Sequence, residues 1–336
     1  MLKFSLILPI FNVENFIGDC LDSLLSQDIS EDEYEIICVN DGSFDSSAEV
    51  VKKYMVNHSN IILLEQQNAG VCAARNRGFE VALGEYIWFI DPDDMIATNC
   101  LKRIYSHMKC TNADILEFGY ETCDETTRYK DMKVDFKIDG YNKKDSSGSG
   151  CLAVCRSSYL KSNYIVWDEH LSYGEDYLWA FQIKYRKHES IFTNSALYFY
   201  RQRSGSAMHS ANHQKTRKHM DDMIRLYAIY ENEYKRCVNE GFAREMLLNI
   251  RKRQQLCIES ALFYLMKLRY DSKQLNQELN NLKNRAIYPY KLMTWNWGGK
   301  EVVNPLKFRI FTFLFPIEPY YKLVCKAYRC IRWRKK

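Results

Sequence analysis

Short apolar runs alternate with amphipathic segments through the first hundred residues. The apolar runs end at polar clusters, as buried parallel strands do, and they occupy residues 4–10, 35–40, 61–64 and 86–90. Between them, apolar residues recur at helical spacing over residues 14–27, 45–56 and 70–83. Strands that alternate with helices across short connections predict a largely parallel sheet covered by helices, which is the α/β architecture of nucleotide-binding domains.

Polar clusters follow the carboxyl ends of all four predicted strands. They are Phe11-Asn12-Val13-Glu14, Asn40-Asp41-Gly42-Ser43, Gln66-Gln67-Asn68-Ala69-Gly70 and Asp91-Pro92-Asp93-Asp94. Ligands of open parallel sheets bind outside the carboxyl ends of the strands. We therefore expect the four clusters to meet on one rim and to form a small-molecule site there.

The rest of the chain follows different patterns. Residues 121–150 are polar and end in a Ser/Gly-rich stretch, which predicts a loop or flap. Later, long helical periodicity predicts helices over 214–236 and 243–269, followed by an Asn/Gln/Lys-rich helix or linker over 271–285. We place a domain boundary near residue 211 and expect a helical region over 211–299.

The composition, with 46% hydrophobic and 26% charged residues, is typical of a globular protein, but the charge is distributed unevenly along the chain. The first hundred residues carry a formal charge of −12, so the remaining residues carry +17 within a total of +5. An acidic, Asp-rich region suits a metal or a polar small molecule, whereas a basic region suits phosphates or a lipid surface. Nucleic-acid binding is disfavoured, because the basic residues lie outside the α/β core and no recognition motif accompanies them.

The cysteines and the N-terminus both indicate a cytoplasmic protein. Twelve cysteines are scattered without a CxxC pair, which favours reduced thiols over disulfides or a zinc site. Pro9 interrupts the N-terminal apolar run and no small-residue cleavage site follows, so we expect a first strand and not a signal peptide. The sequence contains no apolar run of about 18 residues, the length that would span a membrane.

The last segment, residues 300–336, combines many aromatic residues with many lysines and arginines. Pro316 and Pro319 interrupt it, which favours two short amphipathic pieces over a continuous helix. Such a segment suits the interface of an anionic membrane, and we expect a peripheral location on the inner face of the cytoplasmic membrane as one interpretation. The other is a C-terminal helix whose aromatic side chains pack on the core.

The four clusters, in this order and at these separations, resemble glycosyltransferase family 2, whose catalytic domain has the GT-A fold. The matching segments are Leu8–Glu14, Val39–Ser43 with Asp45–Ser47, Asn68–Gly78 and Gly84–Asp94. The resemblance is close over 3–105 and looser over 150–210. It implies a GT-A catalytic domain over residues 1–210, with a nucleotide-sugar half (1–105) and an acceptor half (106–210).

A nucleotide base needs a flat apolar surface and an acceptor for its imide N–H. Phe11, Glu14 and Asp41 could supply both at adjacent strand ends. The resemblance implies that Pro9, Phe11, Asn12, Glu14 and Asp41 contact the base and the ribose. The family often has Tyr where Phe11 stands, so a hydroxyl contact at that position is absent here.

Arg75 and Arg77 are the only arginines among the first hundred residues. They lie where a helix begins after Gly70, a place that suits an anion. One of them is expected to contact the nucleotide or to pair with the aspartates of the next motif, and the plain alternative is a surface salt bridge.

Asp91, Asp93 and Asp94 resemble the DXD element of the family. A diphosphate leaving group needs a divalent cation, and carboxylate oxygens suit Mg²⁺ or Mn²⁺. The resemblance places Asp91 near the ribose, Asp93 on the metal and Asp94 in support, and it leaves open which of the three touches the ion. By the same resemblance His209 completes the metal shell or touches phosphate, although a solvated helix face explains His209 equally well.

The pair Glu175-Asp176 resembles the carboxylates that the family places at the start of a helix beside the acceptor. Asp176 is the candidate general base, which would remove the proton of the acceptor hydroxyl, and Glu175 would orient the site. Without the other motifs, a Glu-Asp pair at the start of a helix would be explained by its favourable interaction with the helix dipole, with no catalytic role. Farther along, Arg201 and Arg203 resemble the residues of the family's closing segment, which implies a place near the diphosphate or near a mobile loop.

These features predict an inverting glycosyltransferase. It would move a sugar from a nucleotide-diphosphate donor, a UDP-sugar, to a saccharide or lipid-linked glycan acceptor in cell-surface polysaccharide synthesis, with Mn²⁺ or Mg²⁺ as cofactor. One alternative is a non-catalytic scaffold with the same fold. Another is a sugar-phosphate nucleotidyltransferase, which would need a Gly-rich phosphate loop after the first strand, where this chain has none.

Overall fold

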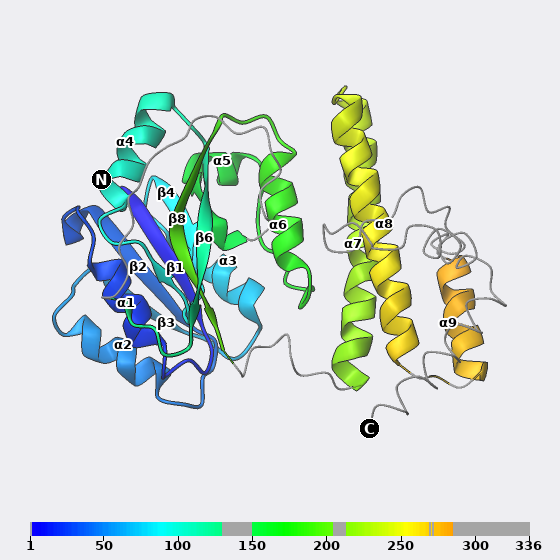
Figure 1. Ribbon diagram of the computed structural model, residues 1–336, viewed down its shortest axis with the longest axis horizontal. Coiled ribbons are helices and arrows are strands. Elements are labelled where there is room, and N and C mark those ends of the chain that lie inside the picture. Colours follow the sequence, from blue (N-terminus) through cyan, green and yellow to red (C-terminus); the bar gives the residue numbers. More distant parts are fainter. Residues whose placement is uncertain (1, 130–149, 204–212, 269, 271, 285–336) are drawn as a thin grey trace. The chain divides into compact units, whose positions relative to one another are not determined.

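The computed structural model describes residues 2–129, 150–203, 213–268, 270 and 272–284. The chain divides into two compact units, residues 1–209 and residues 210–336. The first unit contains the sheet and the helices that cover it, and the second contains the long helices (Figure 1).

Eight strands form one mixed sheet in the first unit. In chain order they are β1 (Phe4–Ile10), β2 (Tyr34–Asn40), β3 (Ile61–Glu65), β4 (Tyr86–Phe89), β5 (Met95–Ile96), β6 (Ile115–Asp124), β7 (Ala153–Arg156) and β8 (Ser190–Gln202). Across the sheet the order is β3-β2-β1-β4-β7-β6-β8-β5. The first four strands of that order are parallel, β7 is antiparallel to both neighbours, and β8 is parallel to β6 and antiparallel to β5. The carboxyl ends of β1 to β4 therefore lie along one edge.

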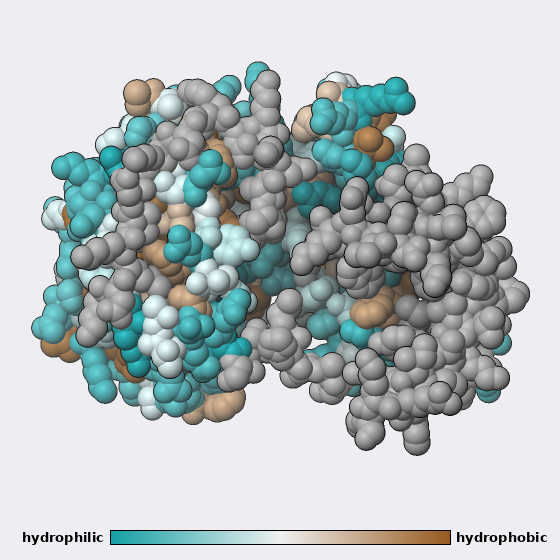
Figure 2. Space-filling model, in the orientation of Figure 1, coloured by the Kyte–Doolittle hydropathy of each residue, from teal (hydrophilic) through white to brown (hydrophobic). Residues whose placement is uncertain are grey.

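Helices cover both faces of this sheet (Figure 1). One face carries α1 (Ile17–Leu25), α2 (Ser47–Met55) and α4 (Leu101–Thr111), and the other carries α3 (Val71–Val81), α5 (Ser157–Ser162) and α6 (Glu175–Lys184). Two short 3-10 helices, η1 (Glu31–Glu33) and η3 (Gly150–Leu152), lie between these elements. The surface at α1 and α2 is mostly hydrophilic (Figure 2), as expected for helices that bury only one side.

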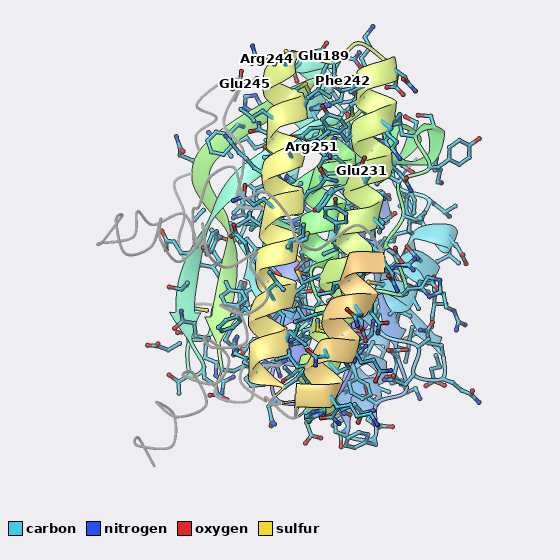
Figure 3. All side chains as sticks on the ribbon, turned by 90° about the vertical axis from the view of Figure 1, so that its right-hand side faces the viewer. Glu189, Glu231, Phe242, Arg244, Glu245 and Arg251 are labelled. Atoms are coloured by element: carbon cyan, nitrogen blue, oxygen red, sulfur yellow. The ribbon has the colours of Figure 1, made fainter. Side chains whose placement is uncertain are left out.

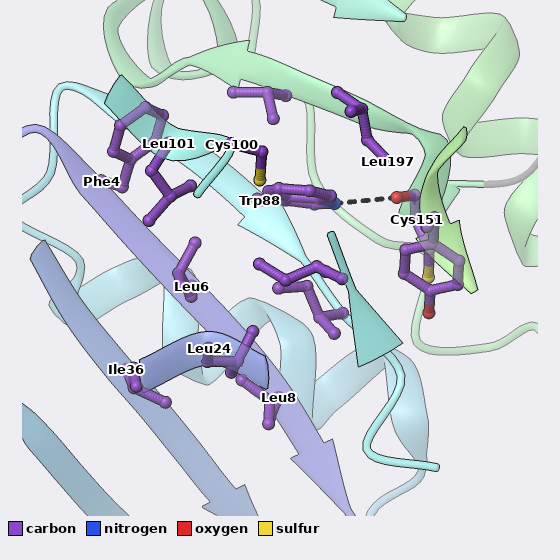
Figure 4. Packing of buried hydrophobic residues seen from close by; sticks show 14 of the residues in the cluster. Phe4, Leu6, Leu8, Leu24, Ile36, Trp88, Cys100, Leu101, Cys151 and Leu197 are labelled. Carbon is purple, nitrogen blue, oxygen red and sulfur yellow. Dashed lines mark hydrogen bonds between the residues drawn. The ribbon is translucent and has the colours of Figure 1, made fainter. Parts of the chain in front are cut away.

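Alternate side chains of β1 enter two different cores, because successive residues of a strand point to opposite faces. Phe4, Leu6 and Leu8 pack with α1, α2 and α4, while Ile7 packs with α3, α5 and α6. Figure 4 shows the first of these cores around Trp88, whose Nε1 donates a hydrogen bond of 2.9 Å to the carbonyl of Cys151. That bond gives the buried indole N–H an acceptor on η3.

The four strands and three helices predicted in the first hundred residues are confirmed, with boundaries that differ by a few residues. The prediction of a loop from residue 121 is wrong at its start. β6 continues to Asp124 because residues 120–124 pair with 198–202 of β8, and polar side chains are compatible with a strand whose outer part is exposed. Residues 130–149 lie outside the described part of the chain.

The second unit contains α7 (His213–Asn239), α8 (Arg244–Lys267) and α9 (Ser272–Asn284). The predicted helices over 214–236 and 243–269 are confirmed, and α9 shows that the segment taken as a helix or linker is a helix. In Figure 3, α7 and α8 run side by side and are joined by polar contacts: Arg251 Nη1 lies 2.6 Å from a carboxylate oxygen of Glu231. Gly241 (φ 73°) makes the turn between the two helices, in a left-handed conformation that favours glycine.

Among the described helices, none combines the length and the apolar character needed to cross a bilayer. The tail over residues 300–336, with its two interpretations, lies outside the described residues. The cysteines of the described residues are free thiols, as the sequence predicts, and Cys20, Cys38, Cys72 and Cys100 are buried.

Candidate active site

The loops that follow β1 and β2 are joined to each other by hydrogen bonds. The backbone N–H of Asn12 donates to Ser43 Oγ (3.1 Å), and Asn12 Oδ1 accepts from the backbone of Phe44 (3.0 Å). Glu14 Oε2 accepts from the backbone of Ser46 (2.8 Å). Asn12 has a φ of 53°, which asparagine tolerates better than most residues. Two of the predicted clusters therefore form one strip of the rim.

Pro9 is a buried residue of β1 and is tolerated there for a local reason. β1 pairs with β2 as far as Ile10, but its pairing with β4 ends at Ile7. The carbonyl of Ile7 accepts a hydrogen bond on the β4 side, and the carbonyl of Ile10 accepts one on the β2 side. Because successive residues of a strand direct their backbone groups to opposite sides, the Pro9 nitrogen points to the β4 side, where β1 and β4 no longer pair. A proline costs no ladder bond at that position, so β1 continues through it to Ile10.

Asp41 fixes the loop that leads from β3 to α3. Its side chain is buried, and its Oδ1 accepts from Gln66 Nε2 (2.8 Å) and from the backbone of Ala69 (2.8 Å), while its Oδ2 accepts from the backbone of Gly70 (2.9 Å). A carboxylate has about four acceptor positions, so one remains for a ligand such as an imide N–H. That contact stays a prediction.

Two aromatic side chains stand on the rim beside these loops. Phe11 is 43% exposed and Phe44 is 86% exposed, and their rings meet edge to face with centroids 5.9 Å apart. Each ring by itself presents a flat apolar face of the kind that a nucleotide base requires. Phe44 is not among the residues predicted from the sequence, although its position directly after Asp41-Gly42-Ser43 was the available signal.

Arg75 lies beneath the rim between two carboxylates. Its side chain is 3% exposed; Nη2 donates to Asp91 Oδ1 (2.7 Å), and Nη1 lies 3.7 Å from Asp176 Oδ1. Burial lowers the pKa of Arg75, but the neighbouring carboxylates raise it more, so the net shift is upward and the side chain is a permanent cation. Of the two roles predicted for this arginine, the structure shows the pairing with an aspartate of the next motif.

Glu175 and Asp176 begin α6, directly after Gly174, which has a φ of 82°. Burial, together with the charge of Asp176, raises the pKa of Glu175 to about 7. Burial also raises the pKa of Asp176, while the Arg75 cation acts in the opposite direction. A carboxylate whose pKa moves toward neutrality is a better proton acceptor at physiological pH.

The three aspartates after β4 have three different environments. Asp94 is buried; its Oδ2 accepts from the Tyr198 hydroxyl (2.7 Å) and its Oδ1 accepts from the backbone of Arg201 (2.8 Å). Burial and the charges of Asp91 and Asp93 raise its pKa to about 8. Asp94 thus attaches the aspartate loop to β8, and its oxygens face protein.

Asp91 and Asp93 keep oxygens toward the surface, with side chains 31% and 18% exposed. Asp91 pairs with Arg75 as described, and Asp93 pairs with Arg203 Nε at 2.6 Å. Within the described residues, no group of three His, Cys, Asp or Glu side chains is arranged to hold an ion. Mg²⁺ and Mn²⁺ sites that share the metal with substrate phosphates need only one or two carboxylates, and Asp93 with Asp91 fits that donor set. His209 lies outside the described residues.

The structure corrects the role predicted for Arg201. Its side chain has no exposed surface, and its guanidinium contacts Asp19 (3.3 Å), the carbonyl of Glu125 (3.2 Å) and the ring face of Phe16. An arginine enclosed in this way supports the core beneath the site, whereas contact with a diphosphate requires an accessible guanidinium. Arg203 is partly exposed and remains the candidate for that contact.

Several residues near the site were missed by sequence reasoning. Tyr198 donates to Asp94 and also accepts from the backbone N–H of Asp91 (3.1 Å), so one hydroxyl ties both ends of the aspartate loop. Tyr200 is partly exposed, and burial together with the charges of Asp94 and Asp93 raises its pKa. Their spacing in an alternating strand was the signal, since positions two apart share one face.

Comparison with known proteins agrees with this geometry. The family model described as Glycosyl transferase family 2 matches residues 5–162. A poly(ribitol-phosphate) beta-glucosyltransferase of Bacillus spizizenii is 30% identical over 214 residues, which cover 62% of this chain and 33% of that protein. The chain thus spans about a third of the length of curated relatives of this kind.

Two solved structures have a similar fold. Staphylococcus aureus TarS 1–349 in complex with UDP-GlcNAc superposes with a TM-score of 0.57 at 21% identity, covering 84% of this chain and 85% of that one. The mannosyltransferase PcManGT of Pyrobaculum calidifontis, in complex with GDP-Man and Mn²⁺, has a TM-score of 0.51 at 15% identity and covers 99% and 88%. Given this match and this sheet, residues 5–162 belong to glycosyl transferase family 2, and the unit built on them has the GT-A fold.

Proposed function

We propose that this chain is an inverting glycosyltransferase that moves a sugar from a UDP-sugar to a saccharide or lipid-linked glycan acceptor in the synthesis of a cell-surface polysaccharide. The observation that carries the proposal is the position of Arg75. One buried guanidinium contacts Asp91, from the nucleotide-sugar half, and Asp176, from the acceptor half. The carboxylate expected to act on the acceptor thus lies next to the motif expected to hold the donor.

The donor would lie along the rim. Phe11 and Phe44 offer an apolar surface for the base, and Glu14 and the remaining acceptor position of Asp41 are close by in the same loops. Arg203 would face the diphosphate. The fold shared with a UDP-GlcNAc complex of TarS supports a UDP-sugar as donor.

The residues after β4 fit a divalent cation. Asp93, with Asp91, would hold Mn²⁺ or Mg²⁺, which would offset the negative charge that develops on the departing diphosphate. Asp94 would not be a ligand, because its side chain is buried and its oxygens are directed to the Tyr198 hydroxyl and the Arg201 backbone. The Mn²⁺ complex of PcManGT supports this cofactor.

Asp176 would act as the general base. The acceptor oxygen would form its bond to the anomeric carbon from the face opposite the diphosphate, while the bond to the diphosphate oxygen breaks and the acceptor proton moves to Asp176. Attack from that face inverts the configuration. The Bacillus relative is named a beta-glucosyltransferase, which supports inversion, because a β product requires inversion when the donor carries its sugar in the α configuration.

A panel of nucleotide sugars with Mn²⁺ tests the proposal. We expect one nucleotide sugar to bind and to be consumed, slowly by hydrolysis alone and faster with a glycan acceptor, and we expect EDTA to stop its consumption. Indifference to every nucleotide sugar would overturn the donor site. Binding without consumption under all conditions would favour the non-catalytic scaffold instead.

A further inference from the structure

Hydrogen bonds alone leave the position of Arg75 underdetermined. Nη2 carries the bond to Asp91 and a weak contact with the Cys151 sulfur (3.8 Å), whereas Nη1 and Nε make no hydrogen bond within the described residues. The ion pair with Asp176, at 3.7 Å, is longer than a hydrogen bond. A buried guanidinium with so few directed bonds needs another contact to fix its plane.

Trp167 provides that contact. The guanidinium carbon of Arg75 lies 4.1 Å from the centroid of the Trp167 ring, within the range of a cation–π interaction, which is strongest on tryptophan and in a desolvated place. Planar stacking also orients the guanidinium, because arginine is itself flat.

The Trp167 ring is in turn held on several sides. It stacks on Trp179 with centroids 4.6 Å apart and planes 1° from parallel, and it meets Phe89 edge to face at 5.4 Å. A Cβ atom added to Gly150 would come within 2.3 Å of the ring, so no space for a shift exists on that side. The indole therefore has one position.

The backbone of Trp167 is fixed by the residue that follows Arg75. Asn76 Oδ1 accepts from the Trp167 N–H, and Asn76 Nδ2 donates to the Trp167 carbonyl, both at 2.9 Å. α3 thus supplies the arginine and, one residue later, the amide that anchors the segment carrying the indole. Asn76 Nδ2 also bonds Glu169 (2.9 Å), which extends the anchor along that loop.

We infer that Trp167 is a positioning residue, which holds the Arg75 guanidinium between the carboxylates of Asp91 and Asp176. The inference rests on the proposed function in one respect, the role of Asp176 as base. Asp176 lies 3.7 Å from Arg75 Nη1, and the charges of Asp91 after β4 and of Glu175 on its own helix act on the same group of carboxylates. The Cys151 thiol contacts Arg75 Nη2, the nitrogen that also bonds Asp91. If the Arg75 guanidinium were displaced, the carboxylates of Asp91 and Asp176 would lose the positive charge between them.

Enzyme kinetics of matched variants test the inference. With Trp167→Leu we expect kcat to fall about tenfold or more, with a smaller change in the KM for the donor, whereas Trp167→Phe keeps a ring and should stay within about threefold of wild type. Removing the cation from Asp176 raises the pKa of its carboxyl, so the acid limb of the kcat–pH profile should move to higher pH in Trp167→Leu. Phe79→Leu shortens another aromatic of the same core, one that packs edge to face on Phe89, and it should leave the profile unchanged.

Asn76→Asp provides a milder variant if Trp167→Leu fails to fold. It removes the donor to the Trp167 carbonyl and should shift the profile in the same direction. Crystal structures of the variants report the guanidinium position whether or not transfer occurs: the Arg75–Asp176 contact should persist in Trp167→Phe and be lost in Trp167→Leu. An unmoved guanidinium and an unshifted profile in Trp167→Leu would overturn the inference. A wild-type protein that transfers no sugar would refute the proposed function alone, since the crystal structures would still decide the position of Arg75.

Discussion

The two sides of the site are held together in different ways. On one side, the loops after β1, β2 and β3 are joined by hydrogen bonds between side chains and backbone, with Asp41 and Asn12 as the main acceptors. On the other side, Asp91, Asp93 and Asp176 are each paired with an arginine. The first side should therefore be sensitive to the loss of a hydrogen-bond acceptor, and the second to charge, pH and divalent cations.

The largest expected effect is on the charged side. Asp176→Asn removes the proton acceptor, so we expect kcat to fall by about 10²–10⁴ while nucleotide affinity changes little. Steady-state kinetics and nucleotide titration measure the two separately. Asp221→Asn, at an exposed ion pair of α7, is the matched control and should be fully active. An active Asp176→Asn enzyme would refute the base assignment.

The hydrogen-bonded side should respond to Asp41→Ala. Gln66 and the backbone of Ala69 and Gly70 would lose their acceptor, and losing hydrogen bonds to a charged group costs about 1.5–3 kcal/mol. We expect the free energy of unfolding to drop by about that amount in urea denaturation, together with loss of nucleotide binding. Asp32→Ala, in η1, removes an exposed carboxylate and is the control. Unchanged stability in Asp41→Ala would mean that the loop is held by other contacts.

Asp94 makes stability depend on pH. Its pKa is about 8 in the folded protein and about 3.9 in an unfolded chain, so the folded state binds the proton more tightly. That stabilisation is complete below the unfolded pKa and is lost as pH rises through the folded pKa. We expect the free energy of unfolding to fall by on the order of 1 kcal/mol or more between pH 5 and pH 8, and Asp94→Asn to flatten this slope. A flat wild-type profile would show that the Tyr198 hydroxyl and the Arg201 backbone keep Asp94 ionised.

The smallest effect concerns Arg203 and the metal. Arg203 pairs with Asp93, so it competes with a divalent cation for that carboxylate. Arg203→Gln should strengthen Mn²⁺ binding several-fold, by on the order of 1 kcal/mol, in a titration without nucleotide. Arg251→Gln, at an ion pair within the helical unit, should leave Mn²⁺ binding as it is. Weaker Mn²⁺ binding in Arg203→Gln would show that Asp93 is not a ligand.

Much of the first hundred residues could be predicted from the sequence because its signals are local. Four apolar runs gave β1 to β4, and the polar clusters at their ends meet on one edge, as the bonds between Asn12 and Ser43 and between Asp41 and Gly70 show. Pairing partners of the later strands were less accessible. β8 contacts both β6 and β5, and nothing in its own sequence specifies those neighbours.

The sequence by itself determined which residues are candidates for the site: the order of strands and polar clusters places Asp41 and Asp91 among them, and the resemblance to the family adds Asp176. Only the tertiary structure decided what each residue contacts. Asp94 is bound by Tyr198, 104 residues away, and Arg201 is enclosed beside Asp19, 182 residues away. Burial depends on elements that are distant along the chain, and burial decides whether a charged side chain faces a ligand or supports the residues that do.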